Sequence, residues 1–232
     1  MSDDKLIREM NAYYDRRAPW HDEYLSYESN EKMEALLGPI IRRVEEFIVG
    51  QDVLEVACGT GIWTQVLTRR ARTVVATDVN SSVIEIARRK EYRGAQPAFV
   101  VADAYRLDEI ESSFDLAFMT DWWTHVPRQM LPSFMEGLHR RLRKNAHVVV
   151  IDMMPQNIHQ GNDVVYDADG NRRRQRILPD GSQFEVVKNF PTEQELTKVI
   201  DPYADQIHYW QDQALLRWVL IYRLRNQSTD PT

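Results

Sequence analysis

The sequence has a single cysteine, Cys58, among its 232 residues. One thiol excludes an internal disulfide framework and any metal cluster built on several cysteine ligands. Apolar runs are short, and none reaches the roughly 18 residues expected of a membrane-spanning helix. The first residues lack the basic and apolar regions of a secretory signal. We therefore expect a cytoplasmic protein with no membrane segment and no metal site.

The sequence has fewer positive than negative residues. It contains 29 lysines and arginines and 35 aspartates and glutamates, which gives a net charge of -6. That sign disfavours a main role in binding the phosphate backbone of nucleic acids. A hydrophobic content of 43% over this length is sufficient for one sizeable core. We expect one domain spanning residues 1–232 that acts on a small molecule, as a monomer or a homodimer.

Glycine is also sparse, but Gly59 and Gly61 lie one residue apart. They follow Val53–Ala57, a run typical of a strand, and a helical pattern resumes at Ile62. Glycines at such a junction allow a tight turn and close approach of a ligand to the main chain. The third glycine of the dinucleotide fingerprint is absent, since Thr64 occupies its position. The stretch therefore predicts a nucleotide-like ligand that lacks a pyrophosphate.

Strand and helix patterns alternate through the middle of the chain. Strands are expected at 52–57, 72–77, 98–102, 114–120 and 146–152, and helices at 62–70, 82–91, 105–110 and 130–142. Two more strands are expected at 205–210 and 215–224. The alternation predicts an α/β fold with helices on both faces of a parallel sheet, and a ligand at the carboxyl ends of the strands.

Two segments flank or interrupt this pattern. Residues 1–48 predict a helical lid, with helices at 5–19 and 31–47, the second interrupted at Gly38-Pro39, and an aromatic stretch between them. Turn signals at 169–171 and 179–181 predict an antiparallel β meander over residues 156–191 that caps the substrate. Thr192 and Glu195 then predict a capping box at a helix start.

Acidic residues recur at the predicted strand ends. Glu55 precedes the glycines, Asp78 ends the second strand and Asp103 ends the third. Carboxylates suit an amine, a pair of ribose hydroxyls and an adenine amino group, and they do not suit phosphates. Any one of these acids alone could equally be a helix cap or a solvated loop residue. Their joint occurrence favours an adenosyl amino acid without phosphate.

These stretches resemble the ordered motifs of class I S-adenosylmethionine-dependent methyltransferases. The similar segments are Glu55–Gly61, Thr77-Asp78, Ala102–Ala104 and Phe114–Ala117, and the resemblance spans about residues 10–225. It implies a Rossmann-like seven-stranded sheet with its last strand antiparallel and S-adenosylmethionine above the first strands. Arg143–His147 departs from the family's usual Pro-Gly-Gly turn. The implied cofactor-binding residues are Tyr14, Glu55, Ala57, Gly59, Gly61, Trp63, Asp78, Val79, Asp103, Ala104, Thr120 and Trp122.

The segment after the fourth strand contains Trp122, Trp123 and His125. Paired tryptophans can exclude water and pack against a sulfonium or a flat substrate, so Trp123 is predicted to contact the substrate. His125 can act as a general base or as a hydrogen-bond donor to the reacting oxygen. The alternative is that His125 caps the next helix and the tryptophans belong to the core.

A closer resemblance is to small-molecule O-methyltransferases of the dehydrophos phosphonate type. It rests on Tyr13-Tyr14, Gly61–Thr64, His125–Pro127 and the segment from Arg176 to Phe190. It implies a catalytic His125 and a substrate held by Tyr27, Arg176 and Lys188. Tyr24 is the neighbouring alternative to Tyr27.

Cations on the predicted meander support binding of an acidic substrate, because Arg172, Arg174 and Arg176 would share one face of a strand. Fixed cations orient a carboxylate or phosphonate, which is already ionised at neutral pH. For Arg172–Arg174, a solvated face or a dimer interface is an equal alternative.

We predict an S-adenosylmethionine-dependent O-methyltransferase acting on a small anion. N-methylation and a catalytically silent cofactor-binding module stay open, and a nucleic-acid methyltransferase or a nicotinamide oxidoreductase is disfavoured.

Overall fold

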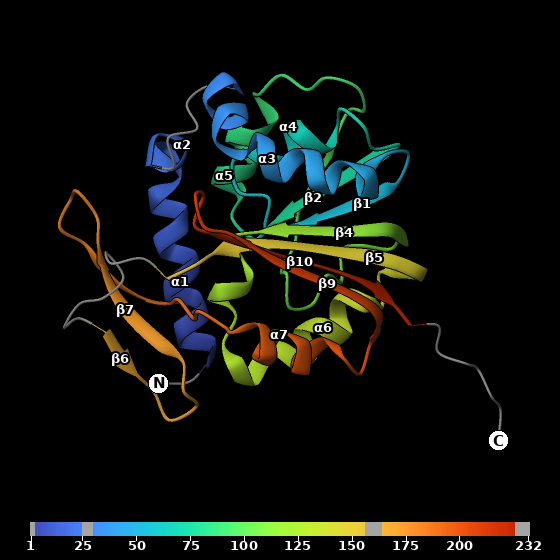
Figure 1. Cartoon of the computed structure of the whole chain (residues 1–232). Coiled ribbons are helices and arrows are strands. Elements are labelled where there is room, and N and C mark those ends of the chain that lie inside the picture. The colour runs from blue at the N-terminus through green and yellow to red at the C-terminus, as the bar shows by residue number, and fades with distance from the viewer. Residues whose placement is uncertain (1–2, 25–29, 156–163, 226–232) are drawn as a thin grey trace.

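A computed structural model of the chain describes residues 3–24, 30–155 and 164–225. At its centre is a seven-stranded sheet in the order β3-β2-β1-β4-β5-β10-β9 (Figure 1). The strands are β1 (Asp52–Val56), β2 (Thr73–Asp78), β3 (Ala98–Val101), β4 (Phe114–Thr120), β5 (Leu142–Met153), β9 (Ala204–Asp212) and β10 (Arg217–Leu224). Strands β1 to β5 pair in parallel, and β10 is antiparallel to both of its neighbours. The predicted α/β class and antiparallel last strand are confirmed.

Helices cover both faces of this sheet (Figure 1). On one face lie α3 (Asn30–Ile48), α4 (Ile62–Leu67) and α5 (Ser81–Arg88), and on the other lie α6 (Leu131–His139) and α7 (Glu193–Ile200). In β1, Val53 packs in the core of the first face, while Leu54 and Val56 pack in that of the second. A parallel strand buried on both sides is largely apolar for this reason, and Glu55 is the buried exception in β1.

Two local predictions are wrong. Helix α3 continues through Pro39 without a break, because Leu37, Ile40 and Val44 bury its apolar stripe on the sheet. Residues 105–110 form turns and no helix, and Leu107 adopts a left-handed backbone with φ 52°. The capping box of α7 is confirmed, since the Thr192 hydroxyl accepts from Glu195 N and the Glu195 carboxylate accepts from Thr192 N.

A small antiparallel sheet follows β5, as predicted. It consists of β6 (Val164–Tyr166), β7 (Arg172–Ile177) and β8 (Gln183–Val187), in that order. Helix α1 (Asp3–Arg17) packs on β8 and joins the two parts of the structure (Figure 1). It continues into η1 (Ala18–Trp20) and α2 (His21–Tyr24). Within the described ranges, no helix has the length and apolar character to cross a bilayer.

Candidate active site

A cavity of about 400 Å³ opens at the carboxyl ends of the central strands. Its walls come from α1, from the loops after β1, β2, β3 and β4, and from the small sheet. The predicted site residues that line it are Tyr14, Ala57, Gly59, Trp63, Asp78, Val79, Asp103, Ala104, Thr120, Trp122, His125, Arg176 and Lys188. Segments that are far apart in the sequence therefore meet around one space.

One end of the cavity presents acceptor groups. The two carboxylate oxygens of Asp78 accept hydrogen bonds from Gly59 N at 3.0 Å and from Asn80 N at 2.9 Å. Burial raises the pKa of Asp78 above its ordinary value. Asp103 accepts from Tyr105 N at 2.9 Å through one oxygen only. Each carboxylate oxygen has two lone pairs, so both acids keep acceptor capacity toward the cavity.

The other end of the cavity contains His125, which closes the short helix η2 (Trp123–His125). Its Nδ1 lies 2.6 Å from Val187 O, and since a carbonyl oxygen only accepts, Nδ1 carries the proton. Its Nε2 is then an acceptor, and the Tyr14 hydroxyl donates to it at 2.8 Å. Burial first, and then the positive charge of Lys188, hold the pKa of His125 well below its ordinary value. The imidazole is therefore neutral at neutral pH.

The comparisons with known proteins agree with this geometry. Residues 53–145 match the model of the methyltransferase domain family. The solved DhpI complex with SAH is 24% identical, with a TM-score of 0.75, over 97% of this chain and 100% of that one. The N-methyltransferase NodS of Bradyrhizobium japonicum WM9 is 13% identical, with a TM-score of 0.62, over 92% and 97%. The chain therefore contains a methyltransferase domain and has the fold of class I S-adenosylmethionine-dependent methyltransferases.

A curated relative of this methyltransferase is the malonyl-[acyl-carrier protein] O-methyltransferase of Serratia marcescens. The two are 20% identical over 157 residues, which span 66% of this chain and 58% of the relative.

The polar groups at the first end of the cavity fit the cofactor of this family. An adenosyl group carries two ribose hydroxyls and one amino group as donors, and Asp78 and Asp103 supply acceptors on adjacent strand ends. The Trp122 side chain lines the same cavity and packs edge-on against the Tyr105 ring, with the ring centroids 5.6 Å apart. It adds an aromatic surface beside these acceptors.

The two glycines of the first loop have different surroundings in the methyltransferase. Gly59 has φ 55°, and a Cβ added there would have His21 Nε2 as its nearest atom, at 3.9 Å. Gly61 has φ 80°, but a Cβ there would lie 2.6 Å from Tyr92 Oη and 2.9 Å from Ala87 Cβ. Gly59 therefore leaves room at the cavity wall. Gly61 does not line the cavity, and its lack of a side chain allows the loop to pack on α5.

Two further predicted residues lie behind the cavity wall. Glu55 is 2% exposed, accepts from the Thr64 hydroxyl at 2.5 Å, and has its pKa raised to about 8 by burial. Trp123 is also 2% exposed and belongs to the core beneath the sheet. Neither side chain reaches the cavity, since both point into packed layers. The predicted Tyr27 lies outside the described residues.

Lys188 lines the cavity but is already paired. Its ammonium donates to the Thr124 hydroxyl at 2.6 Å and lies 3.4 Å from both Asp152 Oδ1 and His125 Nε2. Lys188 is 3% exposed and Asp152 is fully buried, so they form a buried ion pair. Arg176 lines the same end and forms no ion pair within the part of the chain that the structure describes.

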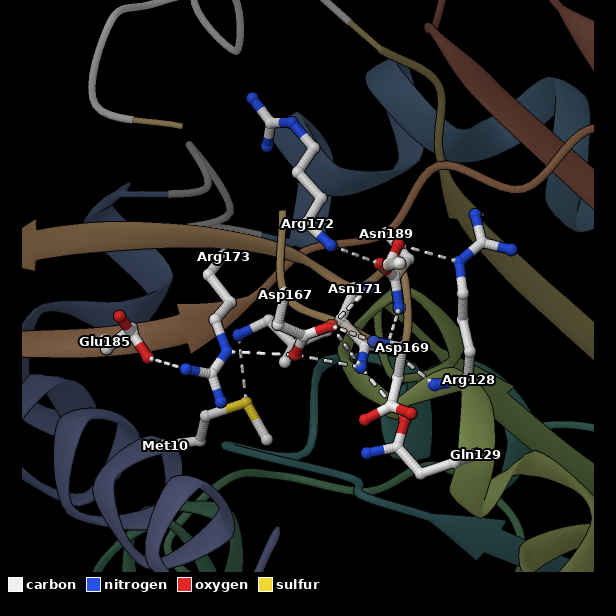
Figure 2. A network of polar contacts seen from close by, with 12 residues as sticks. Met10, Arg128, Gln129, Asp167, Asp169, Asn171, Arg172, Arg173, Glu185 and Asn189 are labelled. Atoms are coloured by element: carbon white, nitrogen blue, oxygen red, sulfur yellow. Dashed lines mark hydrogen bonds and ion pairs between the residues drawn. The ribbon is translucent and has the colours of Figure 1, made fainter. Parts of the chain in front are cut away.

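Two other arginines of β7 contact side chains of the small sheet and of the segment after it. Arg173 pairs with Asp167 at 3.1 Å and with Glu185 at 2.9 Å within the small sheet (Figure 2). The Arg172 guanidinium stacks over the Phe190 ring at 5.3 Å. Of the predicted cations Arg172, Arg174 and Arg176, the cavity is lined by Arg176 and not by the other two.

Arg17, Asp121 and Arg217 are charged cavity residues that sequence reasoning missed. Arg17 lies one helical turn after Tyr14 on α1, so helical spacing was an available signal. Asp121 and Arg217 form a side-chain ion pair between the end of β4 and the start of β10, and both line the cavity. These two residues are 96 positions apart, and no local pattern connects them.

Proposed function

We propose that this methyltransferase transfers the methyl group of S-adenosylmethionine to an ionised oxygen of a small anionic molecule, a carboxylate or a phosphonate. The observation that supports this proposal most is the composition of one cavity end. There a neutral, buried His125 lies beside Lys188, and Arg176 adds a second cation.

The cofactor would occupy the end of the cavity with Asp78 and Asp103. Asp78 would accept hydrogen bonds from the ribose hydroxyls, and Asp103 would accept from the adenine amino group. When bound, the cofactor supplies an electrophilic methyl group on a sulfonium. The chain's own contribution is to hold the acceptor oxygen in line with that methyl group and to exclude water.

The surroundings of His125 favour an acceptor that has already lost its proton. A proton taken up at Nε2 would create a cation 3.4 Å from the Lys188 ammonium. Positive charges on Arg176 and Arg17 also lower the pKa of His125. His125 is therefore a weak base, and a carboxylate or phosphonate oxygen needs no base at neutral pH. We assign to His125 an indirect role, in which its Nε2 accepts from the Tyr14 hydroxyl and so holds that side chain in place at the acceptor end.

The cations differ in the role that we propose for each. Asp152 already balances the charge of Lys188, while Arg176 has no acidic partner within the described residues. Arg176 would thus contribute most to binding the anion, through its planar guanidinium. Because Asp152 balances the charge of Lys188, the cations would not fully neutralise the substrate anion, and its attacking oxygen would stay nucleophilic. An ammonium substrate would be repelled at this end, which disfavours amine acceptors.

The names of the relatives support the same class of reaction. DhpI is a phosphonate O-methyltransferase, and the Serratia marcescens relative is a malonyl-[acyl-carrier protein] O-methyltransferase. NodS is an N-methyltransferase on the same fold, so the fold itself does not decide between oxygen and nitrogen.

A paired acceptor screen tests this proposal. Purified protein and S-adenosylmethionine are incubated with small carboxylic and phosphonic acids, with the amide or ester of each acid, and with amines, and mass spectrometry follows the gain of one methyl group. We expect methylation of acids and none of their neutral partners. His125→Ala should lower turnover while affinity for S-adenosylhomocysteine stays the same. Methylation confined to amines would reject the proposal.

A further inference from the structure

One residue outside the cavity contacts the main chain on both sides of His125. The backbone N–H of Asn189 donates to Thr124 O at 2.7 Å. Its side-chain Nδ2 donates to Val126 O at 3.2 Å. The carbonyls immediately before and after the histidine are therefore both bound by Asn189.

The same segment also contacts the imidazole itself. Val187 O accepts from His125 Nδ1 at 2.6 Å, and the Lys188 ammonium lies 3.4 Å from Nε2. Residues 187–189 thus contact the ring at both nitrogens and the backbone at both ends. The position of this segment fixes the tautomer and the direction of Nε2.

Asn189 is itself held by a buried network (Figure 2). Its Oδ1 accepts from Arg172 N at 2.9 Å, and its Nδ2 donates to Asn171 Oδ1 at 3.2 Å. Asn171 in turn accepts from Arg128 N at 2.7 Å and donates to Gln129 Oε1 at 2.9 Å. Asn189 is 5% exposed and Asn171 is fully buried. Buried polar groups with satisfied partners specify one geometry, because any shift leaves a donor or acceptor unpaired.

We propose that Asn189 is a positioning residue that sets the imidazole of His125 relative to Tyr14 and Lys188. The expected effect of Asn189 on the reaction rate rests on the proposed function, whereas its effect on the position of the imidazole does not. A displacement of about 1 Å at a reacting centre can lower the rate about a hundredfold. The insertion between β5 and α7 therefore acts on the reaction through Asn189 as well as through Arg176.

Two Asn189 variants and a matched control test the proposal. Asn189→Asp keeps the acceptor Oδ1 but places an oxygen against Val126 O and Asn171 Oδ1, and Asn189→Ala removes the whole amide. Gln175→Ala is the control, because Gln175 is exposed on the same small sheet and its side chain bonds only to Gln183 in the described structure. Nitrogen-15 NMR of labelled histidine reports the tautomer and titration of His125. Calorimetry with S-adenosylhomocysteine and kcat for an acid found in the screen complete the set.

In the wild type and in Gln175→Ala, His125 should show one tautomer, protonated at Nδ1, and should titrate well below its ordinary value. In both Asn189 variants we expect mixed tautomers and a pKa that moves up toward about 6.5, as solvent reaches the ring. The groups that face it are Tyr14 and Arg17 from α1, Arg176 from β7, and Lys188. We expect kcat to fall about tenfold to a hundredfold, with affinity for S-adenosylhomocysteine unchanged.

An unchanged His125 tautomer in the Asn189 variants would overturn the proposal. So would a parallel loss of cofactor affinity and of the His139 signal, which would mean that Asn189 stabilises the whole fold. His139 suits this purpose because it is half-buried at the end of α6, away from the cavity, where partial burial lowers its pKa to about 4. If the wild type methylates no acid, the proposed function fails, while the NMR comparison still decides the role of Asn189.

Discussion

Replacing Gly61 with alanine should destabilise the fold more than replacing Gly59, and replacing Gly59 should weaken cofactor binding. At Gly61 the new Cβ would lie 2.6 Å from Tyr92 Oη and 2.9 Å from Ala87 Cβ. At Gly59, which lines the cavity, the nearest atom would be His21 Nε2, at 3.9 Å. Both glycines have a positive φ, so backbone strain is common to the two variants.

The expected magnitudes follow from these contacts. A non-glycine residue in the left-handed region costs about 1–2 kcal/mol, which applies to both positions. Overpacking adds about 1–3 kcal/mol at Gly61 alone. The reduced entropy of the unfolded chain offsets about 0.4–1 kcal/mol in each case. Gly61→Ala should therefore lose about 2–4 kcal/mol, or about 5–15 °C in Tm for a chain of this size.

Denaturant unfolding of the ligand-free proteins and calorimetry with S-adenosylhomocysteine separate the two effects. Adding Tyr92→Phe to Gly61→Ala removes the hydroxyl that the new Cβ meets, so the double variant should recover part of the lost stability. Tyr92→Phe alone gives the control, because it loses the 2.6 Å hydrogen bond to Ala87 O. Equal destabilisation by Gly59→Ala and Gly61→Ala would refute the assignment of Gly61 to packing.

Three further perturbations address single groups. Asp78→Ala should weaken binding of S-adenosylhomocysteine about tenfold to a hundredfold by calorimetry, because a charged acceptor contributes about 1.5–3 kcal/mol per hydrogen bond. Lys188→Met leaves Asp152 buried without its partner and should cost about 3–5 kcal/mol of unfolding free energy, most of which Lys188→Met with Asp152→Leu should restore. Glu55 has a folded pKa of about 8, above its unfolded value, so it binds more protons in the folded state between these two values. Relative to Glu55→Gln, the wild type should lose about 1.4 kcal/mol of unfolding free energy per pH unit from about pH 4.5 to 8.

Each of these expectations has a contrary result. Wild-type affinity in Asp78→Ala would remove Asp78 from the cofactor site. A double variant no more stable than Lys188→Met would show that the ion pair is not the source of the cost. Parallel pH profiles for the wild type and Glu55→Gln would show that Glu55 is ionised in the folded protein throughout that range.

The sheet and the cofactor end of the cavity could be predicted because their signals are local. Asp78 and Asp103 follow apolar runs, and the end of a strand can be read from a few neighbouring residues. The same motif includes Glu55 and Gly61, but motif membership does not say which way a residue faces. Their side-chain directions depend on α4 and α5 packing against the loop, which are tertiary contacts.

The acceptor end was less accessible to sequence reasoning because its partners are distant. Lys188 was predicted as a substrate cation, but its ion pair with Asp152 spans 36 positions. His125 was found by its position after β4, whereas the contact of its Nδ1 with Val187 spans 62 positions. Pro39 shows the converse case, in which a local helix-breaking signal is overridden by burial of the helix on the sheet.

Transfer of a carbon-13-labelled methyl group shows whether this protein methylates an oxygen of an acid, because NMR of the product identifies the atom that received the methyl group. The measurement compares the wild type, Arg176→Gln and the control Gln175→Ala on one acid and its amide. We expect an oxygen-bound methyl group on the acid alone. We also expect the KM for the acid to rise about tenfold to a hundredfold in Arg176→Gln, with kcat little changed. A methyl group on nitrogen, or the same KM in all three proteins, would contradict it.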